Sequence, residues 1–268
     1  SFGKPYLQNE EFKYARYFLC ILKSLIRSLS ITQSKSIYKQ CMSGIRVFDL
    51  RVNMDTENTF YIWHGFKCQT LAKVLFDFYK FTLLHPSEIL ILVIRIEPTL
   101  NLIDQMKFDS HFREYRSYII NPTNEWTTPI SQLRNGGRSW LVYANQNMSD
   151  HSKSDTYGNL NIFNSHWYDE NSVSKQLINL QNELNIALPK DKAPKKYMMQ
   201  WIVTPQASDY VIGFIFKCLL PAKKLGLRNM ATKMNNELNN FIMKSDNKEL
   251  MKERVSVIKG DYFEVAGL

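Results

Sequence analysis

Six consecutive aliphatic residues at positions 89–94 (ILILVI) constrain the fold of this chain more than any other feature. A strand with one face in water alternates apolar and polar side chains. An uninterrupted aliphatic run of this length is typical of a strand that is covered on both faces. Such strands occur in parallel sheets with helices packed against them. The run therefore predicts an α/β fold that contains a parallel sheet.

The rest of the chain alternates between strand-like and helix-like patterns. Strands are expected at residues 45–52, 59–64, 88–96, 139–144, 198–203 and 255–258. Helices are expected at residues 11–29, 36–43, 71–84, 102–118 and 173–187 and in most of 210–244, and a short turn is expected at 130–133. This order favours a TIM-type (β/α) barrel, and a doubly wound sheet is the second interpretation. Its 268 residues suit one barrel domain spanning residues 1–268.

Composition and charge narrow the classes of function. The formal net charge of +9 suits polyanionic partners such as nucleic acid, an anionic membrane or phosphorylated ligands, although it also fits a basic surface without any partner. No RNA-binding aromatic motif or helix-turn-helix pattern is present, so nucleic acid is not expected. The four cysteines are widely spaced and indicate neither a zinc site nor a disulfide framework, in keeping with a cytoplasmic location. No apolar stretch is long enough to span a bilayer.

Ionisable residues follow or end three successive apolar runs. Asp49 and Arg51 end the first run, His64 ends the second, and Arg95 and Glu97 end the third. In α/β barrels, functional residues gather at the carboxyl ends of the strands, so these five side chains are expected to form one cluster. A structural salt bridge such as Asp49 with Arg51 is the alternative for any one strand.

The other histidines are weaker candidates. His85 precedes a proline and is expected to be a helix cap or packing residue. His111 is expected on a solvated helix face. His166 follows a polar loop, where an ordinary packed position is at least as good an interpretation as a pocket. No HxH or HExxH pattern or acidic metal-binding loop is present, so no metal site is expected.

In order along the chain, several segments resemble the X domain of phosphatidylinositol-specific phospholipase C, in its non-modular animal form. The segments are TQSKSIYKQ at 32–40, GIRVFDLR at 44–51, YIWHG at 61–65, HPSE at 85–88, the aliphatic strand at 89–94, His166-Trp167, the helix at 173–184, QWIVTP at 200–205 and the strand end at 257–264. The resemblance implies a barrel enzyme that cleaves a phosphodiester in phosphatidylinositol-type lipids to diacylglycerol and a cyclic inositol phosphate.

The resemblance also implies roles for individual residues. His64 matches the histidine that protonates the leaving diacylglycerol oxygen, and Arg51 matches the arginine that contacts the phosphate in the metal-free branch of the family. Asp49 would orient this cluster. Asp261 matches the carboxylate that supports the family's first histidine. No metal and no cofactor are implied, because Ca²⁺-dependent relatives have an acidic ligand where this chain has Arg51.

Two further implications concern the headgroup and the family's first histidine. Arg95 and Glu97 resemble the pair that contacts inositol in bacterial members, whereas residues 143–145 lack the arginine that those members carry on that strand. The family's first histidine belongs to a Ser/Thr-His-Asp-Ser motif on its first strand. The motif and the strand would precede Ser1, so the barrel is expected to lack its first strand here. A closing helix would follow Leu268. Without that histidine, a catalytically inactive lipid- or phosphoinositide-binding module is the alternative.

A lipid substrate implies peripheral contact with a membrane surface. The apolar stretch at 210–220, after the expected strand at 198–203, is the first candidate for the contacting rim, and an ordinary barrel helix is the competing interpretation. A glycerophosphodiester or sphingomyelin hydrolase is a more distant alternative, since such barrels need a metal bound by carboxylates.

Overall fold

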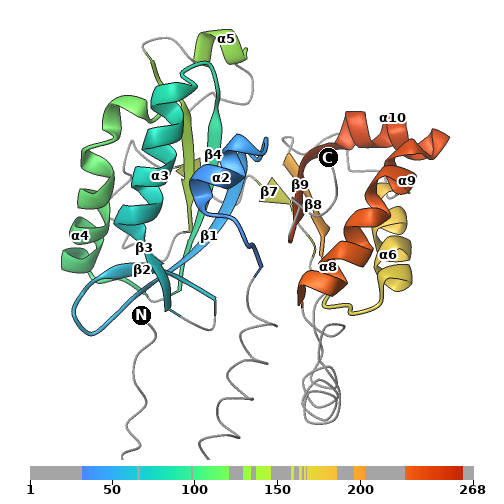
Figure 1. The fold of residues 1–268 in the computed structure, drawn as a ribbon, viewed down its shortest axis with the longest axis horizontal. Coiled ribbons are helices and arrows are strands. Elements are labelled where there is room, and N and C mark those ends of the chain that lie inside the picture. The colour runs from blue at the N-terminus through green and yellow to red at the C-terminus, as the bar shows by residue number, and fades with distance from the viewer. Residues whose placement is uncertain are drawn as a thin grey trace, which may run out of the picture. The chain divides into compact units, whose positions relative to one another are not determined.

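The computed structural model describes residues 32–64, 67–97, 99–120, 129–133, 137–145, 158–159, 163–164, 166, 168–185, 196–202 and 227–261. The chain divides into two compact units (Figure 1). One unit is Lys35–Ile162, and the other combines Ser1–Ser34 with Phe163–Leu268. The expectation of a single domain over residues 1–268 stays a prediction.

The Lys35–Ile162 unit is built on a six-stranded sheet with the order β3-β2-β1-β4-β5-β6. The strands are β1 Val47–Met54, β2 Phe60–Trp63, β3 Lys67–Thr70, β4 Leu90–Ile96, β5 Trp140–Ala144 and β6 Gly158–Asn159. β4 pairs in parallel with β1 on one side and with β5 on the other. Val93, on the face of β4 opposite Leu92, is buried as completely as Leu92 itself. The expected parallel strand with two buried faces is therefore confirmed.

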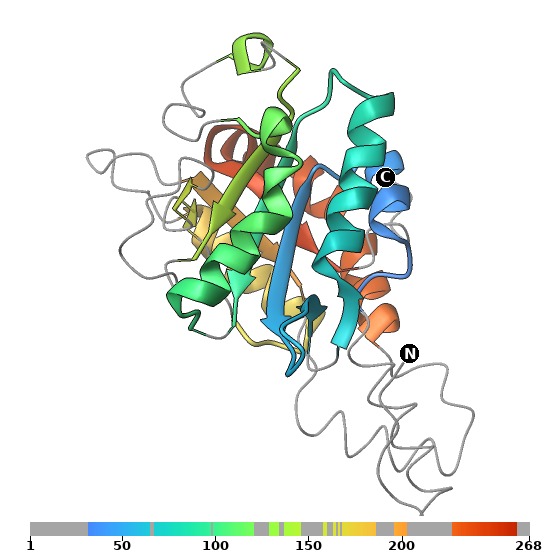
Figure 2. The ribbon, with the colours of Figure 1, turned by 90° about the vertical axis from the view of Figure 1, so that its left-hand side faces the viewer.

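The helices α3 Leu71–Leu84 and α4 Leu102–Arg113 cover one face of this sheet (Figure 2). The unit also contains α2 Ile37–Met42, the 3₁₀ turn η2 Arg116–Tyr118 and α5 Ile130–Leu133. α3 and α4 lie side by side over β1 and β4 (Figure 2). Phe48, Leu50 and Val52 alternate along β1 and point into the apolar core beneath these helices. The residues between them, Asp49 and Arg51, lie on the other face of the sheet.

Local signals explain the limits of α3. The side chain of Thr70 accepts a hydrogen bond from the backbone N–H of Lys73 and caps the first turn. Apolar residues then recur at helical spacing and are buried in the core. The helix ends at Leu84 with His85 as its C-cap, directly before Pro86, which cannot continue a helix. The sequence predicts both ends of this helix correctly.

The Phe163–Leu268 unit contains a three-stranded parallel sheet with the order β7-β8-β9. Its strands are β7 Phe163–Asn164, β8 Lys196–Trp201 and β9 Val255–Gly260, and its helices are α6 Val173–Asn185, α8 Leu227–Asn236, α9 Leu238–Met243 and α10 Ser245–Arg254. Trp201 anchors the core of this unit, where its indole N–H donates to the Met234 carbonyl at 3.1 Å.

Three expectations need correction. β2 runs antiparallel to β1, and β3 returns antiparallel to β2, so the sheet is mixed and not fully parallel. The polar edge strand β3 and helix α10 were not anticipated. Residues 130–133 form a short helix instead of a turn. The expected helix at 11–29, the stretch at 210–220 and residues 203–205 lie outside the described residues.

Candidate functional site

Arg51 and Arg95 are direct neighbours across the central pair of strands. The parallel register of β1 and β4 places Arg51 opposite Arg95 and Asp49 opposite Val93. Paired residues of parallel strands project from the same face, which here is the face away from α3 and α4. The two arginines and Asp49 therefore form one cluster, as the sequence predicts.

The cluster combines two guanidinium groups with one buried carboxylate, and a second, exposed carboxylate follows on β4's carboxyl side. The Asp49 carboxylate is 8% exposed, and its Oδ1 lies 3.5 Å from Nε of Arg95, which is 46% exposed. Glu97 lies two residues beyond Arg95 on the same face and is exposed. Like charges directly opposite each other across strands are destabilising. One buried carboxylate beside two paired guanidinium groups is an arrangement that an anion with several oxygens would complete.

Burial changes along this face of the sheet. At the level of Asp49, Val93 and Tyr143 are paired neighbours on β4 and β5 and are almost fully buried. One level closer to the carboxyl edge, the Arg95 side chain is half exposed. The cluster thus has a closed apolar floor and is open toward the carboxyl edge. This is the edge at which α/β barrels carry their active sites.

Asn145 holds the end of the strand that carries Arg95 and Glu97. Leu90 N–H donates to the Ser139 carbonyl, and Asn145 N–H donates to the Ile94 carbonyl, as in an ordinary parallel ladder. Beyond this point the Asn145 side chain, and not the backbone of β5, makes the hydrogen bonds to β4. Its Oδ1 accepts from Ile96 N–H at 2.8 Å, and its Nδ2 donates to the Ile96 carbonyl at 2.9 Å. The side-chain amide thereby extends the hydrogen-bond ladder between β5 and β4 by one pair of bonds, as a further peptide group would. No sequence pattern indicated this role.

His64 does not lie on the kind of strand that was expected. The sequence interpretation placed it at the carboxyl end of a parallel neighbour, but β2 runs antiparallel to β1. Val52 pairs with Ile62, and this register, continued by two residues, meets Leu50, whose side chain lies on the opposite face of the sheet from Arg51. The imidazole is exposed one residue beyond the end of β2, and its place in the site stays a prediction.

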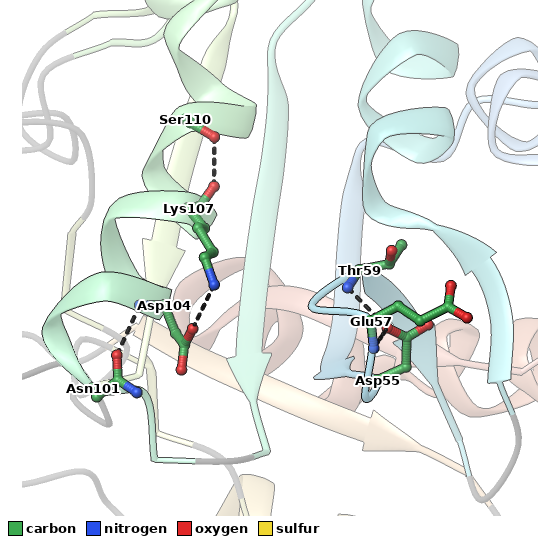
Figure 3. A network of polar contacts seen from close by, with 7 residues as sticks. All are labelled: Asp55, Glu57, Thr59, Asn101, Asp104, Lys107 and Ser110. Carbon is green, nitrogen blue, oxygen red and sulfur yellow. Dashed lines mark hydrogen bonds and ion pairs between the residues drawn. The ribbon is translucent and has the colours of Figure 1, made fainter.

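The turn of this hairpin is held by Asp55. Its Oδ1 accepts from the backbone N–H groups of Glu57 at 3.0 Å and Thr59 at 2.8 Å (Figure 3). Its other oxygen forms an ion pair with Lys67 on β3. The hydrogen bond from Lys67 is the main reason why the pKa of Asp55 lies below its usual range. These contacts join the β1–β2 turn to β3 and so fix both sides of the segment that carries His64.

The other two described histidines of this unit, His85 and His111, have structural positions. His85 is the C-cap of α3 and stacks on Phe81 with ring centroids 4.6 Å apart, as expected for a packing residue. His111 does not lie on a solvated face. It is half-buried with its ring edge-to-face against Phe60, and this burial lowers its pKa.

Asp261 and His166 belong to the other unit. Asp261 directly follows β9, and its backbone carbonyl accepts from Nδ2 of Asn235 at 2.9 Å. His166 is exposed, with its ring 4.6 Å from that of Tyr168. The placement of these residues relative to the Asp49 cluster is not described. Their roles therefore remain predictions.

Within the described part of the chain, no group of three or more His, Cys, Asp or Glu side chains is placed to hold a metal ion. Among the helices of the same part, none has the length and apolar character needed to cross a bilayer.

Comparison with known proteins shows the fold. The sequence matches no family model and no curated protein. Among solved structures, the phosphatidylinositol-specific phospholipase C of Listeria monocytogenes matches with a TM-score of 0.62 and 18% identity, over 91% of this chain and 84% of that one. The Staphylococcus aureus enzyme with incorporated pentafluoro-Phe matches with a TM-score of 0.62 and 16% identity, over 88% and 79%. A further S. aureus structure, which concerns modulation of that enzyme's membrane binding, matches with a TM-score of 0.61 and 17% identity, over 88% of this chain and 79% of that one.

These similarities define the class of fold. The chain is a mixed α/β protein that shares the fold of bacterial phosphatidylinositol-specific phospholipases C. They support the expected TIM-type barrel. Closure of the barrel and the absence of its first strand stay predictions, because the two sheets are described separately.

Proposed function

We propose that this chain belongs to a phosphatidylinositol-specific phospholipase C-like phosphodiesterase that acts on phosphatidylinositol-type lipids at a membrane surface. The observation that carries the proposal is the pairing of Arg51 with Arg95 beside the buried Asp49 carboxylate. The guanidinium group of Arg51 can contact the non-bridging oxygens of a phosphodiester, and that of Arg95 beside it can donate to the hydroxyl groups of the attached inositol. The shared fold and the order of the sequence motifs support the same class of substrate.

In the proposed reaction, the inositol 2-hydroxyl of the lipid attacks phosphorus and the bond to the diacylglycerol oxygen breaks. A general base removes the hydroxyl proton, and His64 donates a proton to the leaving oxygen, so that diacylglycerol and a cyclic inositol phosphate are released. Arg51 stabilises the charge that develops on the phosphate. Asp49 holds Arg95 in place, and Arg95 and Glu97 contact the inositol ring.

The proposed base is the family's first histidine, which would be supplied by residues before Ser1 and supported by Asp261. No metal takes part in this mechanism, because Arg51 supplies the positive charge that a cation supplies in Ca²⁺-dependent relatives.

Substitution of Arg51 tests the proposal. In a protein that includes the first histidine, Arg51→Ala should lower the hydrolysis of labelled phosphatidylinositol by about 10²–10³-fold, as is typical when one preorganised donor is lost. The rate of hydrolysis by Arg51→Lys should lie between those of the parent and of Arg51→Ala, because a lysine keeps the charge and loses the planar fork of the guanidinium group. Arg116→Ala, which changes an exposed arginine on η2, is the control and should be neutral. Parent-like hydrolysis by Arg51→Ala, or activity abolished by EDTA and restored by Mg²⁺, would contradict the assignment.

A catalytically inactive binding module is the second candidate. Of the described histidines in the Lys35–Ile162 unit, His85 and His111 pack elsewhere, which leaves His64 as the candidate acid. This reaction needs both a base and an acid. If the protein with its natural upstream sequence binds an inositol phosphate through Arg51 and Arg95 without any turnover, the binding module is the correct interpretation.

A further inference from the structure

The first turns of α4 present a compact apolar surface to solvent. Leu102, Ile103 and Met106 are 55%, 65% and 63% exposed, and we refer to these three residues as the α4 platform. They lie within five consecutive positions, so that their side chains are contiguous. Isolated exposed apolar residues are common on protein surfaces, whereas a contiguous group next to a candidate site indicates an interaction surface.

Another face of α4 packs firmly against the sheet. The platform residues are therefore true surface residues and not core residues that have lost their contacts. Gln105, Phe108 and Phe112 follow each other at helical spacing and are almost fully buried against the sheet. At 100° per residue, the three platform residues fall on one arc on the outer side of the helix, away from this buried stripe. Asn101 caps the helix by accepting from the backbone N–H of Asp104 at 2.9 Å (Figure 3).

The platform lies at the open edge of the candidate site. α4 begins directly after residues 98–101, which follow Glu97 at the carboxyl end of β4. Figure 3 shows Asn101 at the same end of the sheet as the turn that contains Asp55 and Thr59. A ligand that reaches Arg51 and Arg95 from this edge passes near the beginning of α4. The platform, on the outer side of the first turns of α4, therefore lies close to the surface of whatever carries the ligand.

We propose that the α4 platform is a membrane-docking surface that inserts into the headgroup boundary of a phospholipid bilayer. The choice of partner rests on the proposed function, since a lipid whose phosphodiester enters the arginine cluster stays embedded in its bilayer by its acyl chains. Leucine, isoleucine and methionine side chains at the rim gain free energy by leaving water for the acyl region. Arg113 lies further along the same outer arc of α4, where it can meet phosphate groups.

Two matched variants of the full chain test the proposal. Ile103→Ser with Met106→Ser removes most of the platform without changing charge. Leu83→Ser with Leu84→Ser removes two side chains of comparable exposure from the last turn of α3, which leads into the start of β4 and thus lies at the opposite edge of the sheet. Binding is measured by co-sedimentation with vesicles of phosphatidylcholine alone and of phosphatidylcholine with phosphatidylinositol.

The platform variant should bind both kinds of vesicle at least about tenfold more weakly than the parent, and the α3 variant should bind as the parent does. Ile103→Trp should bind more tightly, because indole rings favour the bilayer interface. A partly unfolded protein can also bind vesicles more tightly, so the gain counts only if this variant melts at the temperature of the parent. All three proteins should keep the melting temperature of the parent.

Equal loss in both double variants, unchanged binding in the platform variant, or a parent that does not bind vesicles would overturn the proposal. A change in oligomeric state of the platform variant without vesicles would overturn it in favour of contact with a second copy of the chain. The proposed function fails in a different way: vesicle binding persists and follows the platform, but the protein with its upstream histidine hydrolyses no inositol phosphodiester.

Discussion

Replacing Asn145 should loosen the strand end that carries Arg95 and Glu97. In Asn145→Ala, Ile96 loses the acceptor of its N–H and a donor to its carbonyl, which lie 2.8 and 2.9 Å from the amide. Each hydrogen bond contributes about 1 kcal/mol net, and a buried backbone group left without its partner costs about 1–3 kcal/mol. Because Ile96 is buried and Asn145 is only half-buried, water can reach part of the gap. We expect a loss of about 2–3 kcal/mol in the free energy of unfolding.

Two measurements check this prediction. Urea denaturation gives the change in the free energy of unfolding. Hydrogen exchange of the Ile96 amide reports directly whether its hydrogen bond to residue 145 is lost. The exposed Asn236 at the end of α8 provides the control, and Asn236→Ala should leave both quantities unchanged. An Ile96 amide in Asn145→Ala that exchanges as slowly as in the parent would refute the argument that the side chain completes the ladder.

Asn145→Asp separates the two hydrogen bonds. The aspartate keeps an acceptor for Ile96 N–H but turns a carboxylate oxygen toward the Ile96 carbonyl. The neutral carboxyl can donate to that carbonyl, so this pairing raises the pKa of the new group in the folded protein. A raised pKa stabilises the fold below the unfolded-state value of about 3.9 and loses this effect as the pH rises through the folded value. The variant should therefore lie closer to the parent at about pH 4 than at about pH 7, and an equal deficit at both values would contradict the assigned geometry.

Two further predictions concern the core and the pH dependence of stability. Thr82→Val should destabilise by about 1–3 kcal/mol in urea, because the buried Trp140 indole N–H loses the acceptor that lies 2.8 Å away, whereas Thr82→Ser should keep most of the bond. Burial lowers the pKa of His111, so the stability linked to this ring is present above its ordinary value of about 6.5 and is lost as the pH falls through the lower folded-state value. His111→Gln should reduce the difference between urea midpoints measured at about pH 7.5 and pH 5, and an unchanged difference would show that other groups cause it.

The elements predicted well from sequence are those whose signals are local. α3 combines a capping threonine, apolar residues at helical spacing and a proline after its end, and its bounds were predicted to the residue. β4 was recognisable because burial on both faces demands an uninterrupted aliphatic run. Neither depends on which element packs against it. The same reasoning could not find β3, whose four residues are all exposed and carry no apolar pattern.

The direction of β2 was predictable, although the sequence interpretation missed it. A crossover between parallel neighbours needs a dozen or more residues, whereas the expected strands at 45–52 and 59–64 are separated by six. A connection this short permits only a hairpin. Applied to the sequence, this length rule would have given the antiparallel direction of β2. Asn145 is different, because its role depends on where the β5 backbone ends, and no local pattern encodes that point.

The hairpin has a consequence for how the candidate site is assembled. Asp49, Arg51 and His64 all come from one continuous segment, which contains the hairpin turn held by Asp55. Arg95 joins them through the parallel register of β4, which is the next strand of the same sheet. The proposed anion-binding and proton-donating groups therefore form within the Lys35–Ile162 unit. Asp261, whose role stays a prediction, comes from the other unit. Binding of an inositol phosphate and its turnover should accordingly be separable: substitutions at Arg51 weaken both, whereas Asp261→Ala lowers turnover and leaves binding intact.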